Sequence, residues 1–135
     1  MKLNKKILRS CLAEAVRRLS ADSRTNEISI SHYNHFSYII SDNEVVEWGR
    51  NRQAPIPLHW GYDNNYQGLH SEMAAYKKAS GILGSKDFVV VNIRLSNKLH
   101  MLNSMPCKHC QRILKELGCE HIWYTTENGF QKMKL

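Results

Sequence analysis

Two stretches of the chain carry its most specific pattern: Leu69-His-Ser-Glu-Met-Ala-Ala75 and Ser104-Met-Pro-Cys-Lys-His-Cys110. Within them, one imidazole and two thiols come from His70, Cys107 and Cys110, a donor set that suits zinc. Cysteines three residues apart at the start of a helix project to the same side, so a single ion can reach both. Three protein ligands with an open fourth position are the arrangement of a catalytic zinc. We therefore predict a site for about one Zn²⁺ per chain.

Glu72 follows His70 by two residues. On a helix this spacing turns its side chain away from the imidazole, so Glu72 is not expected to complete a four-ligand cage. A carboxylate beside an activated water can accept a proton from it and later deliver that proton to a substrate. We predict that Glu72 is the catalytic residue.

Two other interpretations of the same residues stay open. A structural zinc site, with His109 or Cys119 as the fourth ligand, would bind metal without catalysis. The Cys107-x-x-Cys110 spacing also occurs in redox pairs.

Length and composition are those of a folded domain. The chain has 135 residues, of which 42% are hydrophobic and 23% charged, and we expect one domain over residues 1–135. No apolar run reaches the roughly 20 residues that a membrane span needs, so no membrane partner is expected. Four cysteines without a secretory signal favour a cytoplasmic protein, although the basic residues 1–20 also have features of a mitochondrial transit peptide. The formal net charge of +7 favours anionic partners such as nucleotides or nucleic acid, or serves solubility alone.

Hydrophobic periodicity predicts eight helices and strands in the order α-β-β-α-β-α-β-β. An apolar stripe predicts a first helix over residues 5–20, and a second helix begins near Leu69 and stops at Gly81. Pro106 is expected as the first residue of a third helix that ends at Leu117. The predicted strands are His35–Ser41, Glu44–Trp48, Phe88–Arg94, His121–Thr125 and Phe130–Leu135.

The turns between strands constrain the topology. Asp42-Asn43 is expected to join the first two strands, and Asn128-Gly129 the last two. A parallel crossover needs about a dozen residues, so the short connection at 126–129 predicts that the last two strands are antiparallel. The resulting fold is a three-layer α/β structure, in which helices cover a mixed five-stranded sheet.

The two quoted stretches resemble the cytidine deaminase superfamily, which includes nucleoside, nucleotide, tRNA and DNA deaminases. The resemblance implies that His70, Cys107 and Cys110 bind Zn²⁺ and that Glu72 moves protons. Ser71 departs slightly from the superfamily, where alanine or valine often follows the histidine. The antiparallel last strands resemble the branch that contains free-cytidine deaminases and several nucleic-acid or toxin-type deaminases. This resemblance favours hydrolytic conversion of cytosine to uracil over an adenine substrate.

The superfamily resemblance also implies that Asn51 contacts the sugar of the substrate. We predict Arg52, Trp60 and Ser104 as further substrate-binding residues. The expected partner is a pyrimidine nucleoside, a nucleotide or single-stranded nucleic acid, with a homo-oligomer as a further expectation. A non-catalytic nucleic-acid-binding module with a structural zinc, and an adenine deaminase, are the alternatives.

Overall fold

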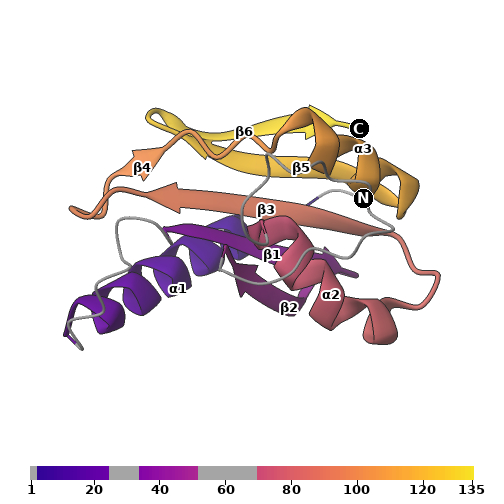
Figure 1. Ribbon diagram of the computed structural model, residues 1–135, viewed down its shortest axis with the longest axis horizontal. Coiled ribbons are helices and arrows are strands. Elements are labelled where there is room, and N and C mark those ends of the chain that lie inside the picture. The colour runs from indigo at the N-terminus through magenta and orange to yellow at the C-terminus, as the bar shows by residue number, and fades with distance from the viewer. Residues whose placement is uncertain (1–2, 25–33, 52–69) are drawn as a thin grey trace.

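A mixed β-sheet with helices on both faces forms the framework of the protein (Figure 1). The computed structural model describes residues 3–24, 34–51 and 70–135. In chain order, the elements are α1 (Lys5–Arg24), β1 (His35–Ser41), β2 (Glu44–Arg50), α2 (Ser71–Leu83), β3 (Phe88–Leu95), β4 (Met101–Leu102), α3 (Lys108–Glu116), β5 (Cys119–Thr126) and β6 (Gly129–Lys134). Each helix and strand predicted from the sequence is present.

The sheet has the strand order β2-β1-β3-β5-β6, with β4 paired to β3. Only β3 and β5 run parallel among the described strands, and β5 pairs antiparallel with β6 as predicted. The sheet has six strands where five were predicted. The difference is β4, whose two residues are too few to show an alternating hydrophobic pattern.

Two hydrophobic cores lie on opposite faces of the sheet, because successive strand residues point to opposite sides. On one face, α1 packs through its apolar stripe onto β1 and β3; the buried residues there include Leu8, Cys11, Ala15, Leu19, Phe36, Tyr38, Ile40, Val89, Val91 and Ile93. On the other face, α2 and α3 cover Ile39, Val90 and Ile122. The predicted three-layer arrangement is therefore confirmed.

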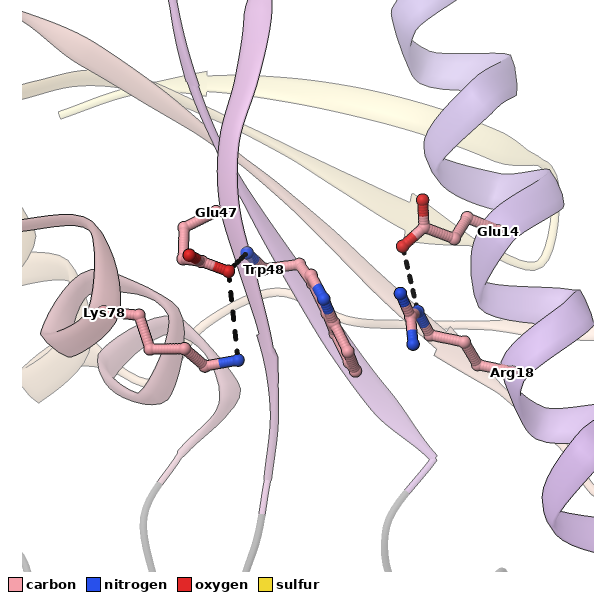
Figure 2. Close-up of polar contacts among 5 residues, drawn as sticks. All are labelled: Glu14, Arg18, Glu47, Trp48 and Lys78. Atoms are coloured by element: carbon pink, nitrogen blue, oxygen red, sulfur yellow. Dashed lines mark hydrogen bonds and ion pairs between the residues drawn. The ribbon is translucent and has the colours of Figure 1, made fainter. Parts of the chain in front are cut away.

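Trp48 of the edge strand β2 connects side chains from both helical layers (Figure 2). The guanidinium carbon of Arg18 in α1 lies 3.6 Å from the centroid of the Trp48 ring, and Nζ of Lys78 in α2 lies 4.7 Å from it. Glu14 pairs with Arg18 at 2.9 Å, and Glu47 Oε1 lies 4.0 Å from Lys78 Nζ. These cation–π contacts link β2 to α1 on one face of the sheet and to α2 on the other.

The helix ends differ from their predictions in an informative way. The second helix continues through Gly81 and ends at Leu83, and its C-cap Gly84 has φ of 57° and ψ of −120°, a positive φ that glycine adopts without steric cost. Pro106 is not the first helical residue, because α3 begins at Lys108 with Cys107 as its N-cap. Within the described residues, no helix is both long and apolar enough to span a membrane.

One hairpin turn is confirmed and the other shifts by one residue. Asp42 and Asn43 have φ values of 53° and 60°, as a two-residue turn with both central residues left-handed requires. Between β5 and β6, Thr126 pairs with Gly129, so the turn residues are 127 and 128. Gly129, with φ of 122°, begins the last strand.

Gly49 in β2 sets how closely α2 approaches the sheet. A Cβ atom at this position would lie 2.5 Å from the backbone nitrogen of Ala75 and 2.9 Å from its Cα. Both atoms belong to the helix backbone and cannot rotate away. Only glycine therefore allows the N-terminal half of α2 to rest on β2 at this distance.

We expect Gly49→Ala to lower the free energy of unfolding by about 1–3 kcal/mol, because the added methyl group must push α2 away from the sheet. Gly81→Ala is the matched control: a Cβ there meets nothing within 4 Å, so the change should be neutral or stabilise the helix by up to ~1 kcal/mol. Urea denaturation of both variants measures the difference. If the two variants had the same free energy of unfolding, the close contact between Gly49 and the backbone of α2 would be contradicted.

Candidate active site

The structure brings together the three predicted metal ligands. Donor atoms of His70, Cys107 and Cys110 all lie within 4.8 Å of one another. His70 Nδ1 is 3.2 Å from Cys110 Sγ and 3.9 Å from Cys107 Sγ. Cys110 is fully buried, and the other two side chains are half-buried. One ion could therefore contact all three donors. Because His70 and Cys107 are partly exposed, the cluster is also accessible from solvent.

Two helix N-termini converge on this cluster. His70 is the N-cap of α2, and Cys107 is the N-cap of α3, where its Sγ accepts a hydrogen bond from the Cys110 backbone N–H at 3.4 Å. The positive end of a helix favours a nearby thiolate. The pKa of Cys107 is lowered to about 3, chiefly by its hydrogen bond with the Cys110 side chain. Hydrogen bonding to Cys107 raises the pKa of His70. The thiolate is the form that a metal ion requires.

The donor set fits zinc, since one nitrogen and two sulfurs match its ligand preference. The two residues considered as a fourth ligand lie outside the cluster. His109 Nδ1 lies 3.1 Å from Arg112 Nη2, and the Cys119 thiol donates to the His121 carbonyl at 3.2 Å. Within the part of the chain that the structure describes, the cluster thus has three donors, as an open site requires.

Glu72 lies in the first turn of α2 and is only 5% exposed. Its two carboxylate oxygens have separate partners: Oε1 accepts from Ser71 Oγ and Oε2 from Asn92 Nδ2, both at 3.2 Å. The carboxylate is not part of the three-donor cluster. A buried carboxylate with a fixed orientation beside a metal site can exchange protons with a substrate.

A buried hydrogen-bond network of Ser37, Asn92 and Ser104 supports the orientation of the Glu72 carboxylate. Ser37 Oγ of β1 donates to Asn92 Oδ1 at 2.6 Å and lies 2.8 Å from Ser71 Oγ. Asn92 Nδ2 also reaches the Ser104 carbonyl at 3.2 Å, and Ser104 Oγ donates to the Asn92 carbonyl at 2.9 Å. Asn92 therefore connects Glu72 to the segment that leads into Cys107.

Ser37 and Asn92 were not among the residues predicted from the sequence. The available signal was Asn92 itself, the one polar residue within the apolar run Phe88–Ile93. A buried polar residue in a central strand needs hydrogen-bond partners, and such networks are often functional.

Of the four predicted substrate-binding residues, Asn51 and Ser104 lie within the part of the chain that the structure describes. Asn51 is half-buried, and its Oδ1 accepts from the His35 backbone N–H at 3.2 Å. Ser104 is 4% exposed, and its Oγ accepts from the Thr125 backbone N–H at 2.7 Å. Its described contacts are therefore internal. Arg52 and Trp60 lie outside the described residues. Substrate contacts of all four residues remain predictions.

A polar cavity of about 350 Å³ lies beside the start of β1 and the end of β3, and Asn51 is part of its wall. The remaining lining residues are Asn34, His35, Arg94, Leu95, Ser96, Asn97 and Leu102. Burial, Arg94 and His70 together lower the pKa of His35 to about 4, so this imidazole is neutral near pH 7. Among the described lining residues, Arg94 is then the one with a positive charge.

Comparison with known proteins supports the fold. No family model matches the chain, and no curated protein sequence matches it. Among solved structures, the chain is similar to the cytidine deaminase from Mycobacterium leprae, with a TM-score of 0.52 and 18% sequence identity. The similarity covers 97% of this chain and 94% of that chain. The likeness to cytidine deaminases that the two motifs predicted is thus confirmed at the level of the fold: the chain has a cytidine deaminase-like fold.

Proposed function

We propose that this protein is a zinc-dependent hydrolase that converts a cytosine base to uracil and releases ammonia. The observation that carries the proposal is the position of Glu72, a buried and doubly hydrogen-bonded carboxylate beside a three-donor metal cluster. A zinc ion held by His70, Cys107 and Cys110 would supply a Lewis acid that makes water a better nucleophile near neutral pH.

The remaining chemistry falls to residues of the chain. Glu72 accepts a proton from the attacking water and transfers it to the ring nitrogen of the base. A second proton passes through the same carboxylate to the amino group, which leaves as ammonia. Ser71 and Asn92 keep the two oxygens of Glu72 in place, so the carboxylate does not have to reorient for each transfer. The net reaction consumes one water for each base.

Two observations support cytosine as the base. The similar structure from Mycobacterium leprae is a cytidine deaminase, and β5 and β6 are antiparallel, as expected for the branch that contains free-cytidine deaminases and several nucleic-acid or toxin-type deaminases. A pyrimidine nucleoside, a nucleotide and a single-stranded nucleic acid are all candidates for the molecule that carries the base.

We expect Glu72→Gln to keep zinc and to lower deamination about 10²–10⁴-fold, because an amide cannot shuttle protons. The glutamine oxygen can still accept from Asn92 Nδ2, and its NH₂ group can donate to Ser71 Oγ, so the side chain can keep its place. Mass spectrometry of cytidine, deoxycytidine, their monophosphates, adenosine, and single-stranded DNA and RNA would detect replacement of the amino group by oxygen. Zinc-loaded wild-type protein that converts no cytosine substrate would refute the proposed function. Undiminished conversion by Glu72→Gln would refute the role of the carboxylate.

Zinc content tests the ligands separately from activity. Wild-type protein should retain about one zinc ion per chain after dialysis, and Cys107→Ser and His70→Ala should retain much less, since each removes one of three ligands. Cys11→Ala is the matched control, because Cys11 lies in the core on the other face of the sheet. Elemental analysis by mass spectrometry provides the measurement. A metal-free native protein with a reversible Cys107–Cys110 disulfide would instead identify a redox pair.

A further inference from the structure

Three successive residue pairs of β1 and β3 lead from the hydrophobic core to the polar cavity. Ile39 pairs with Val90, Ser37 with Asn92, and His35 with Arg94. Alternate residues of a strand share a face, so all three pairs lie on the face covered by α2 and α3. With a rise of about 3.4 Å per residue, neighbouring pairs are about 7 Å apart.

The direction in which a substrate can extend follows from these pairs. The first pair is fully buried in the core, and the second contacts Glu72 through Asn92. A molecule that presents its base to Glu72 cannot extend past Ile39 and Val90. The cavity beside His35 and Arg94 lies at the opposite end of the three pairs, so a substrate that extends away from Ile39 and Val90 extends towards this cavity.

Arg94 gives this cavity the chemistry of an anion site. Its side chain is exposed, and no carboxylate of the described residues forms an ion pair with it. None of the described residues that line the cavity is acidic. A guanidinium group is always charged near neutral pH and binds phosphate oxygens through two parallel hydrogen bonds.

Asn34 adds an acceptor that has no partner. The residue is 7% exposed, and its Nδ2 donates to Asn97 Oδ1 at 3.0 Å. Its Oδ1 is buried and accepts no hydrogen bond. An unsatisfied buried acceptor is costly, so this oxygen fits a ligand that brings a donor. A phosphorylated sugar has both a hydroxyl donor for Asn34 and anionic oxygens for Arg94.

We propose that the cavity formed by Asn34, His35, Arg94 and Asn97 binds the sugar-phosphate part of the substrate. This inference rests on the proposed function, since Glu72 fixes where the base lies. The substrate is then a phosphate-bearing cytosine compound, either a mononucleotide or a nucleic-acid strand, and not the free nucleoside. The net charge of +7 is consistent with an anionic substrate.

Binding to the zinc-loaded Glu72→Gln variant tests this proposal without turnover. Isothermal titration calorimetry would compare cytidine with its 5′-monophosphate, its 3′-monophosphate and a short RNA strand containing one cytosine, whose ribose keeps a 2′-hydroxyl. At least one phosphate-bearing ligand should bind more tightly than cytidine. Adding Arg94→Ala should reduce that preference about tenfold or more, through loss of a charge-assisted contact. The ligand that depends most on Arg94 distinguishes a mononucleotide from a strand.

Two further variants sharpen the result. Arg9→Ala removes the same charge from an exposed position of α1, whose packing face meets the other side of the sheet, and should leave the preference for phosphate unchanged. Asn97→Asp keeps the acceptor for Asn34 Nδ2 but adds a negative charge to the cavity wall, so it should weaken binding of the phosphate-bearing ligand. Equal affinity for cytidine and every phosphorylated ligand, or an equal effect of Arg9→Ala and Arg94→Ala, would overturn the proposal.

The two proposals fail in different ways. If wild-type protein deaminates cytidine and its phosphates equally well, and Arg94→Ala changes neither rate, the deaminase stands and the phosphate subsite is refuted. If the phosphates bind in an Arg94-dependent manner and zinc-loaded wild-type protein converts no cytosine substrate at all, the phosphate subsite stands and the proposed deaminase function is refuted.

Discussion

The close packing of α2 on β2 at Gly49 is the contact on which the candidate site depends. It brings the backbone of Ala75 directly against the sheet, so the first turn of α2 lies over β1 and β3. That placement lets Ser71 meet Ser37, and Glu72 meet Asn92. A side chain at position 49 would separate these pairs. The position of Glu72 thus depends on a contact about 20 residues away in sequence, made by a residue with no side chain.

The polar network around Asn92 is a local departure from an otherwise apolar core. Burial of a carboxylate is unfavourable unless hydrogen bonds replace its lost water. Ser71 and Asn92 supply those bonds to Glu72, and Ser37 and Ser104 in turn hold Asn92. Each polar group has a partner, so the network orients Glu72 while limiting the cost of its burial. Ser71 and Asn92 therefore both orient Glu72 for the proposed proton transfer and offset the free-energy cost of burying it.

On the face of β1 and β3 that α2 and α3 cover, the side chains change from apolar to hydrogen-bonding to charged along the strands. The hydrogen-bonding and charged parts correspond to the base and the phosphate of a nucleotide. Apolar residues close the inner end, hydrogen-bonding residues surround the proposed position of the base, and Arg94 lies where the sheet meets solvent. The charge is exposed, so it remains hydrated until a ligand binds, and no desolvation cost arises in the free protein. One pair of strands can thereby provide the wall of both the base site and the phosphate site.

The sequence alone was enough to predict the helices, the longer strands, the antiparallel C-terminal hairpin and the three candidate metal ligands that the fold brings together. Local signals suffice for these features: residue periodicity, turn chemistry, and a ligand spacing that one helix turn brings together. It did not reveal β4, the passage of α2 through Gly81, the partners of Glu72 or the cavity at Arg94. These features appear only in the folded chain, because each depends on strand register and helix packing between segments far apart in the sequence. Asn92, for example, contacts Glu72 only because α2 packs over β3 in the folded protein.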